Sequence, residues 1–299
     1  MILDLAASIS LAALAGLVPI SIGAAPTPPT EVERLESWPE ISTKERREIE
    51  LNVQRLRKAR SEDMEEEAVD LLEAAGAACA PELLDALGAE KKQPVRAKIE
   101  RLLTAMTGPE HTRLLARELD DSSADVRIFC LRRAARFPDE TLRELAIEHL
   151  ESTLANLEKK RRGSRPEEGY AAALFAASTG ATQGLAPLFA HARDDWKARA
   201  EELRAALIAT RGPEASTIVI GLASADDPRS IEAALRMLWD CGDPDKGAKY
   251  AAEQLYHDNP VVRMAAVNAL RCIVDGDPVL EDISVFDGIQ LADAWKRRM

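Results

Sequence analysis

The stretch Asp258-Asn-Pro-Val-Val-Arg-Met-Ala-Ala-Val-Asn-Ala-Leu-Arg-Cys-Ile273 is the clearest copy of a unit that recurs along the chain. Its apolar side chains fall at helical spacing and form one stripe: Val262, Ala265, Ala266, Ala269, Leu270 and Ile273. The stretch therefore predicts a helix that buries one face.

The same apolar pattern recurs at a nearly constant interval. Its copies begin at Met64, Val95, Val126, Tyr170, Ala200, Ile231 and Val262, with successive steps of 31, 31, 44, 30, 31 and 31 residues. Five of the six steps agree to within one residue, so the period is real. The position eight residues into each copy is expected to face the core: Leu72, Leu103, Ala134, Ser178, Ile208, Trp239 and Leu270.

A second helix is predicted after each of these helices, which we call helix A. A proline followed by an acid opens most of the second helices (helix B): Pro81-Glu82, Pro109-Glu110, Pro138-Asp139, Pro213-Glu214 and Pro244-Asp245. Proline suits the first helical position, because its missing N–H would have no helical partner there. The acid interacts favourably with the positive end of the helix dipole.

Pairs of short helices cannot bury their apolar faces alone, so neighbouring pairs are expected to stack. The segments Asp258…Val262-Arg263 and Asp125-Val126-Arg127 resemble the Asp…Val-Arg signature of HEAT repeats, and Pro94-Val95-Arg96 matches it without the acid. The resemblance covers roughly residues 61–285. It implies an all-α, right-handed α-solenoid of about seven helix pairs with a period of about 31 residues. It also implies ion pairs between adjacent repeats and a habit of binding partners, but no particular activity.

The composition excludes some classes of function. The net charge is −12, which argues against a general nucleic-acid binder, because such proteins need a dominant basic face. The four cysteines are few for a disulfide framework. Cys241 and Cys272 occupy equivalent positions of adjacent repeats, where helix axes lie ~8–10 Å apart. A disulfide needs Cα atoms within about 7 Å, so we expect unpaired thiols, with Cys79, in a turn between helices, the most accessible.

Residues 5–22 carry no charge and are followed by small residues. Residues 1–24 are interpreted as a signal peptide with cleavage before Ala25, or as a membrane anchor, since 18 apolar residues just span a bilayer. Asp4 stands where a signal peptide would carry a basic residue, and a buried helix of a cytosolic protein is the third interpretation. The prediction is an exported bacterial protein, periplasmic or extracellular, or an anchored one whose body lies outside the cytoplasm.

The remaining segments divide by composition. Residues 25–41 form a Pro-rich linker, expected to be extended and solvated, and residues 42–60 form a basic helix opened by a capping box at Ser42 and Glu45. The repeats follow over 61–285, and 286–299 form a C-terminal capping helix. The first repeat, 61–90, has ten acids and no Lys or Arg, so it is either a docking patch for a basic partner or a solvated end cap.

The single long step places an insertion around residues 153–168, which contains Lys159-Lys-Arg-Arg-Gly-Ser-Arg165. Insertions in repeat arrays often map to the binding face, so this loop is a candidate contact for an anionic partner such as a membrane headgroup or an acidic protein. Alternatively, it is a helix end whose cations complement the dipole. The candidate partner-binding residues are those of the insertion and of the B helices: Lys159, Lys160, Arg161, Arg162, Arg113, Arg117, His149 and His191.

The sequence carries no recognisable motif for catalysis or for binding a metal or a nucleotide. It has no H-x-x-x-H or C-x-x-C spacing for zinc, no Gly-rich phosphate loop and no G-x-S-x-G elbow. We therefore predict no catalytic, cofactor-binding or metal-binding residues. The predicted function is a scaffold that binds a protein partner on the concave face of the B helices. The alternatives are a membrane-tethered spacer held by residues 5–22, and a lyase-type enzyme built on HEAT-like repeats.

Overall fold

The computed structural model describes residues 32–281 and 284–299, and within these ranges the chain is helical with no strand. The predicted all-α class is confirmed. The segment interpreted as a signal peptide or anchor lies outside the described residues, as does the first part of the predicted linker. None of the described helices has the combination of length and apolar character that a membrane span requires.

Every predicted A stretch is helical. The A helices are α2 (Glu62–Ala75), α4 (Gln93–Met106), α6 (Ala124–Arg136), α8 (Pro166–Ser178), the second half of α9 (Leu185–Ala209), α11 (Pro228–Cys241) and α13 (Pro260–Leu270). The B helices are α3 (Ala80–Ala89), α5 (Thr112–Arg117), α7 (Arg143–Glu158), the first half of α9, α10 (Pro213–Leu222) and α12 (Lys246–Gln254).

Short 3₁₀ turns adjoin several B helices: η1 (Gly76–Cys79), η2 (Pro109–His111), η3 (Glu118–Asp120), η4 (Glu140–Leu142) and η5 (Thr182–Gly184). The helix α1 (Thr43–Lys58) precedes the first pair, and the π-helical turn η6 (Arg271–Asp275) and α14 (Val285–Arg298) follow the last. The capping box at the start of α1 is present: Glu45 N donates to Ser42 Oγ at 3.3 Å, and Ser42 N donates to Glu45 Oε2 at 2.7 Å.

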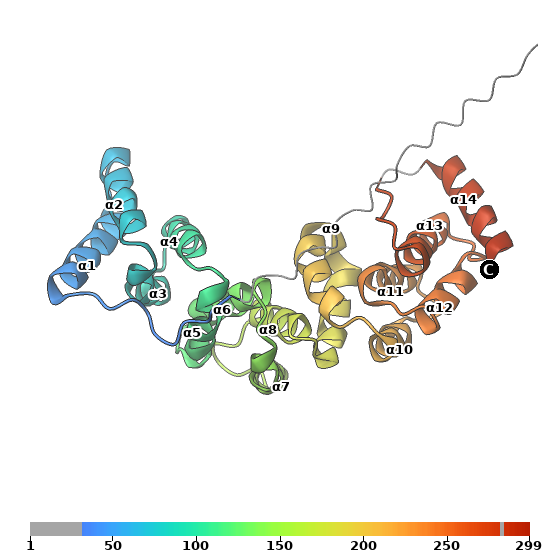
Figure 1. Ribbon diagram of the computed structural model, residues 1–299, viewed down its shortest axis with the longest axis horizontal. Coiled ribbons are helices and arrows are strands. Elements are labelled where there is room, and N and C mark those ends of the chain that lie inside the picture. The colour runs from blue at the N-terminus through green and yellow to red at the C-terminus, as the bar shows by residue number, and fades with distance from the viewer. Residues whose placement is uncertain (1–31, 282–283) are drawn as a thin grey trace, which may run out of the picture. The chain divides into compact units, whose positions relative to one another are not determined.

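The A helices pack on one another in chain order. Helix α6 packs on α8, α8 on α9, α9 on α11 and α11 on α13, as the succession of helices in Figure 1 shows. At the centre of this row, α8 is buried along its length, with no exposed residue from Glu168 to Ser178. Its alanines let the neighbours approach closely: a Cβ added to Gly184 of η5 would lie only 2.5 Å from the carbonyl oxygen of Ala173.

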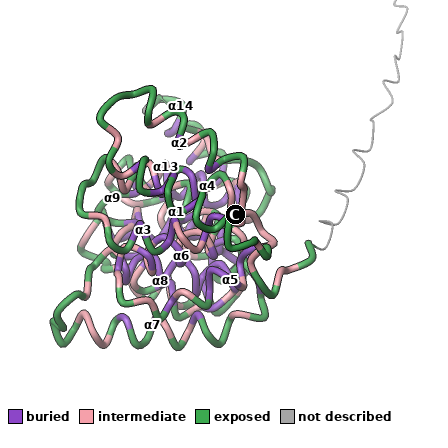
Figure 2. Tube along the Cα trace, turned by 90° about the vertical axis from the view of Figure 1, so that its left-hand side faces the viewer, coloured by how far each residue is buried: buried purple, intermediate pink, exposed green. Residues whose placement is uncertain are grey.

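Buried apolar residues form two clusters that follow the row of A helices. One extends from Ile49 to Cys241, and the other extends from Ile231 to Trp295. Trp239, Tyr250 and Ile273 pack against both, so the core is continuous between them. Figure 2 shows the buried residues gathered between the helices, while α7, which buries only Ala146, Leu150 and Thr153, lies largely at the surface.

The expected core column is buried or half-buried except in one copy. Ile208 is 60% exposed, although Leu203 and Leu207, at two other positions of the same predicted stripe, are fully buried. Helix α9 also differs from the other A helices at Asp195, whose backbone (φ −153°, ψ 55°) is its one non-helical position. There the B helix of one pair runs directly into the next A helix.

The cysteines are unpaired, as predicted, but Cys79 is less exposed than predicted. All four are free thiols, which confirms the prediction that they are unpaired. The expectation that Cys79 is accessible is wrong: this residue is fully buried beneath α3, and its thiol donates to the carbonyl oxygen of Gly76 at 3.0 Å. Cys79 is the one buried residue of the turn η1, and burial raises its pKa to about 12.

The predicted linker also differs from expectation at its C-terminal end. Trp38 and Ile41 are half-buried and pack against the core, so residues 33–41 are docked on the repeats rather than solvated.

Two substitutions test the observed register. Leu270→Asp places a carboxylate at a fully buried position, whereas Ile208→Asp places one at an exposed position of the same predicted column. Removal of a buried leucine costs about 2–5 kcal/mol, and burial of a charge adds to it. We expect a cooperative loss of stability for Leu270→Asp and a change within about 0.5 kcal/mol for Ile208→Asp, measured by urea unfolding followed by circular dichroism. Equal destabilisation by both would contradict the register.

Candidate functional site

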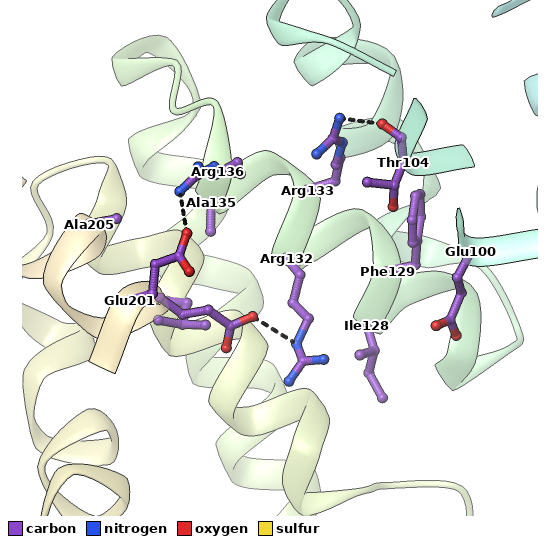
Figure 3. Close-up of a pocket in the computed structure, with 12 residues that line it drawn as sticks. Glu100, Thr104, Ile128, Phe129, Arg132, Arg133, Ala135, Arg136, Glu201 and Ala205 are labelled. Atoms are coloured by element: carbon purple, nitrogen blue, oxygen red, sulfur yellow. Dashed lines mark hydrogen bonds and ion pairs between the residues drawn. The ribbon is translucent and has the colours of Figure 1, made fainter. Parts of the chain in front are cut away.

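A groove of about 460 Å³ lies over four A helices, α4, α6, α8 and α9 (Figure 3). Its lining residues are Glu100, Thr104, Ile128, Phe129, Arg132, Arg133, Ala135, Arg136, Leu174, Glu201, Glu202 and Ala205. None of these belongs to a B helix. The groove therefore lies on the other layer of the helix pairs from the one expected to bind a partner.

Helix α6 supplies both the floor and one charged wall. Cys130, Leu131 and Ala134 of this helix are buried in the core. The residues that line the groove are the apolar pair Ile128 and Phe129 and the arginines Arg132, Arg133 and Arg136. The opposite wall is acidic and comes from Glu201 and Glu202 of α9.

Long ion pairs cross the groove between these walls. Arg136 Nη1 lies 3.6 Å from Glu201 Oε1, and Arg132 Nε lies 3.8 Å from Glu202 Oε1. Arg136 is 55% and Glu201 86% exposed, and pairs of this kind contribute roughly 0–1 kcal/mol. A ligand with its own charges displaces them at small cost.

The three arginines differ in how fully they are bound. Arg133 Nη2 donates to the carbonyl oxygen of Thr104 at 2.6 Å, and its guanidinium lies 4.7 Å from the ring centroid of Phe137, so it holds the end of α4. Arg132 Nη2 pairs with Glu167, but its buried Nε has no hydrogen-bond partner among the described residues. Arg136 is the only one of the three that is exposed, so it is the cation open to a ligand.

Glu100 is the groove's uncompensated carboxylate. It is half-buried on α4 and has no hydrogen bond or ion pair to any residue of 32–281 or 284–299. Burial raises its pKa, which the charges of Arg96 and Arg132 offset in part. A cation of a bound partner would supply the missing counter-charge.

A buried network beneath the groove fixes the position of Arg132. Tyr170 of α8 is fully buried and donates its hydroxyl to Glu202 Oε2 at 3.2 Å. The Arg199 guanidinium lies 4.0 Å above the Tyr170 ring centroid and bonds Glu167, which also accepts from Arg132. Burial raises the pKa of Tyr170, so it stays protonated.

Ion pairs join adjacent A helices from α2 to α11, including Lys98 with Glu65 and Arg204 with Asp240. Arg96 of α4 pairs with Asp125 of α6 at 2.6 Å, and Arg127 of α6 pairs with Glu168 of α8 at 2.6 Å. Arg165 adds a second cation to Asp125 at 2.6 Å. In the last repeat, by contrast, Arg263 donates to the carbonyl oxygens of His257 and Asp258.

The predicted partner-binding residues do not form one site. Lys159, Lys160, Arg161 and Arg162 are exposed at the end of α7, whereas Arg113 and Arg117 of α5 both pair with Glu36 of the same chain.

The two predicted histidines lie in two further places. His149 of α7 is half-buried near the Arg127–Glu168 pair, and its Nε2 has no hydrogen-bond partner in the part of the chain that the structure describes. His191 of α9 contacts the edge of the Tyr170 ring, with centroids 4.6 Å apart.

The groove residues were missed because their signal is weak in the sequence. Arg132 and Arg136 are spaced by one helical turn, as are many charged residues of a solvated helix face. Their acidic counterparts Glu201 and Glu202 lie two A helices further along the chain, so only the packing of α6 and α9 around α8 brings them together.

No group of His, Cys, Asp and Glu residues within the described ranges is arranged to hold a metal ion. Comparison of the chain with protein-family models, curated proteins and solved structures gives no match. The geometry of the groove therefore carries the functional argument alone.

The buried histidines predict a pH dependence of stability. Burial is the main cause that lowers the pKa values of His111, His149 and His191 below their ordinary value of 6.5. Below pH 6.5 the histidines of the unfolded chain bind protons more readily than those of the folded chain, which favours unfolding. The free energy of unfolding is therefore highest above pH 6.5 and decreases as the pH falls below this value. We expect Tm to fall between pH 7.5 and 5.5, by about 2–4 °C for each kcal/mol lost.

His149→Gln should flatten this dependence, because it removes one of the three groups. Thermal unfolding at a series of pH values measures both effects. A Tm that stays constant over this range, or an unchanged slope in the variant, would contradict the prediction.

Proposed function

We propose that this protein is a non-catalytic scaffold, a right-handed HEAT-like α-solenoid that binds a protein partner in the groove over α4, α6, α8 and α9. The 31-residue period, the alternation of A and B helices and the ion pairs at the α4–α6 and α6–α8 junctions support the solenoid. The groove supports the binding function, and it moves the proposed surface from the B helices to the A helices.

The mixed chemistry of the groove carries the proposal. An apolar floor lies between a basic wall with an exposed cation at Arg136 and an acidic wall, and Glu100 has no direct ion pair among the described residues. Buried or half-buried polar groups without partners are costly to a fold, which makes them candidates for groups that bind a partner. Their cost is offset when a partner supplies the missing charges.

The dimensions limit the occupant to a short segment. A volume of about 460 Å³ accommodates a few side chains rather than a domain. The fitting segment has an apolar residue for the floor at Phe129 and Leu174, an acidic residue for Arg136 and a basic residue for Glu100. The exposed cations Lys159–Arg162 are proposed to give a second, weaker contact with an anionic region of the partner.

Export is part of the same proposal, since residues 1–24 have the composition of a signal peptide or anchor. Mass spectrometry of the captured protein reads its N-terminal peptide, and a start at Ala25 would support a cleaved signal.

Charge reversal in the groove tests the site. Arg136→Glu should weaken capture of the partner about tenfold, because one charge-assisted hydrogen bond is lost and a repulsion is added. The measurement is crosslinking in native cells followed by tagged capture and quantitative mass spectrometry. Arg143→Glu is the matched control, since Arg143 is exposed on α7 and has no ion pair among the described residues.

The loop variant Lys159→Glu/Lys160→Glu/Arg161→Glu/Arg162→Glu separates the two proposed contacts. A smaller loss than that of Arg136→Glu would agree with the proposal. A larger loss in the loop variant, with full capture by Arg136→Glu, would place the partner on the loop and overturn the groove.

Glu100→Gln should change stability and binding in opposite directions. Burial disfavours the charged form of Glu100, so we expect its replacement by a neutral amide to raise Tm slightly. The replacement also removes the acceptor for the partner's cation, so capture should fall about threefold to tenfold. Thermal unfolding and the same capture assay measure the two effects. Unchanged capture would show that Glu100 has no ligand in the groove.

A further inference from the structure

Residues 33–41 are here called the docked segment, whose first half lies against α5 and the turns beside it, while its second half adjoins α1 and α3. Leu35 N donates to the carbonyl oxygen of Glu110 at 2.8 Å, which joins parts of the chain 75 residues apart. Figure 1 shows this blue segment passing α5 before it reaches α1. The segment is non-helical, with a bend at Glu36 and Ser37.

The first specific contact of the docked segment is made by Arg34, which is only 19% exposed. Its guanidinium is surrounded by oxygens: Nη2 donates to the carbonyl oxygen of Pro138 at 3.0 Å, and Nη1 donates to Thr112 Oγ1 at 3.1 Å and to the carbonyl of Pro109. Asp139 Oδ2 supplies the counter-charge at 3.8 Å. Such a cage selects a planar cation with several donors.

Glu36 makes the second contact. Arg117 Nη2 donates to its carboxylate at 2.7 Å, and Arg113 Nη1 donates to it at 3.0 Å. Arg117 Nη1 also donates to the backbone oxygen of Glu36 at 2.6 Å. The sequence predicts that these two arginines bind a partner, and an acid of the same chain occupies them.

Trp38 makes the third contact. Its ring stacks on His111 with centroids 5.4 Å apart and planes 19° apart. His111 is buried and held in place, because its Nδ1 accepts from Gly108 N at 3.0 Å. A rigid, flat surface of this kind favours an aromatic side chain.

We propose that α5 and the turns beside it form a peptide-recognition site, separate from the groove, whose resident ligand is the docked segment. The side chains of Arg34, Glu36 and Trp38, at every second position of the segment, each contact a different set of groups. The main-chain hydrogen bond of Leu35 adds affinity, as in the recognition of linear peptides. The partner that fits carries an arginine, an acid two residues later and an aromatic residue two residues after that.

Two features make the docked segment exchangeable. Its central contact is exposed, with Glu36 at 65% and Arg117 at 57%, and exposed ion pairs hold weakly. Helix α6 also packs directly on both α3 and α5. A partner segment therefore competes with the docked segment, whose covalent attachment gives it an effective concentration of about millimolar.

The test uses the full chain with Arg34→Ala, Glu36→Ala and Trp38→Ala, and a fluorescein-labelled peptide of residues 32–41 as the probe. We expect saturable binding in fluorescence polarisation, and binding at least about tenfold weaker to the unaltered chain, because its own segment competes. Arg117→Glu in the triple variant should weaken binding about tenfold, and a peptide carrying Glu36→Arg should restore it. Failure of the folded triple variant to bind, or no effect of Arg117→Glu, would overturn the proposal.

Hydrogen exchange of the unaltered chain keeps the proposal testable if the triple variant does not fold. The amides of residues 33–41 should exchange through local opening, well before those of α6 and α8. Equal protection of the segment and these helices would show that the segment is a permanent part of the fold and would overturn the proposal.

Discussion

The burial of α8 is the constraint on which the rest of the structure depends. Eleven consecutive residues of this helix, Glu168–Ser178, are buried, so its neighbours α6, α7 and α9 must cover every side of it. Alanine dominates this stretch, because larger side chains would hold the neighbours apart. The close approach of α6 and α9 around α8 is what opposes the arginines of one to the glutamates of the other. The groove exists because of this packing.

Polar side chains in the row of A helices have two distinct roles, which burial separates. Arg127 and Glu168 are 18% and 6% exposed and join two repeats by paired hydrogen bonds at 2.6 and 2.9 Å. Such a buried pair is costly to break, because the remaining partner would be left as an unpaired charge. Arg136 and Glu201 lie in solvent, where their interaction is weak. The Arg127–Glu168 pair therefore stabilises the packing of the helices, whereas Arg136 and Glu201 can exchange their ion pair for contacts with a ligand.

The two proposed surfaces lie on different layers of the helix pairs. The groove belongs to the A helices and is open, whereas the site on α5 belongs to the B layer and is filled by residues 33–41. Both combine arginines with an apolar or aromatic contact, as is common where proteins meet. A scaffold with one open and one self-occupied surface would bind a partner in two stages, with the second stage set by competition with its own chain.

The sequence by itself determined the helices of this protein. Apolar residues at helical spacing, prolines at first helical positions and the Ser42–Glu45 box act over a few residues, so local pattern alone suffices to locate helix A and helix B. Only the tertiary structure decided how far individual side chains are buried, as the exposed Ile208 and the buried Cys79 show, because burial depends on which neighbouring helices cover a position. It alone also paired Glu36 with Arg117, and Arg132 with Glu202, since such contacts join distant residues through the stacking of helices and leave no local pattern in the sequence.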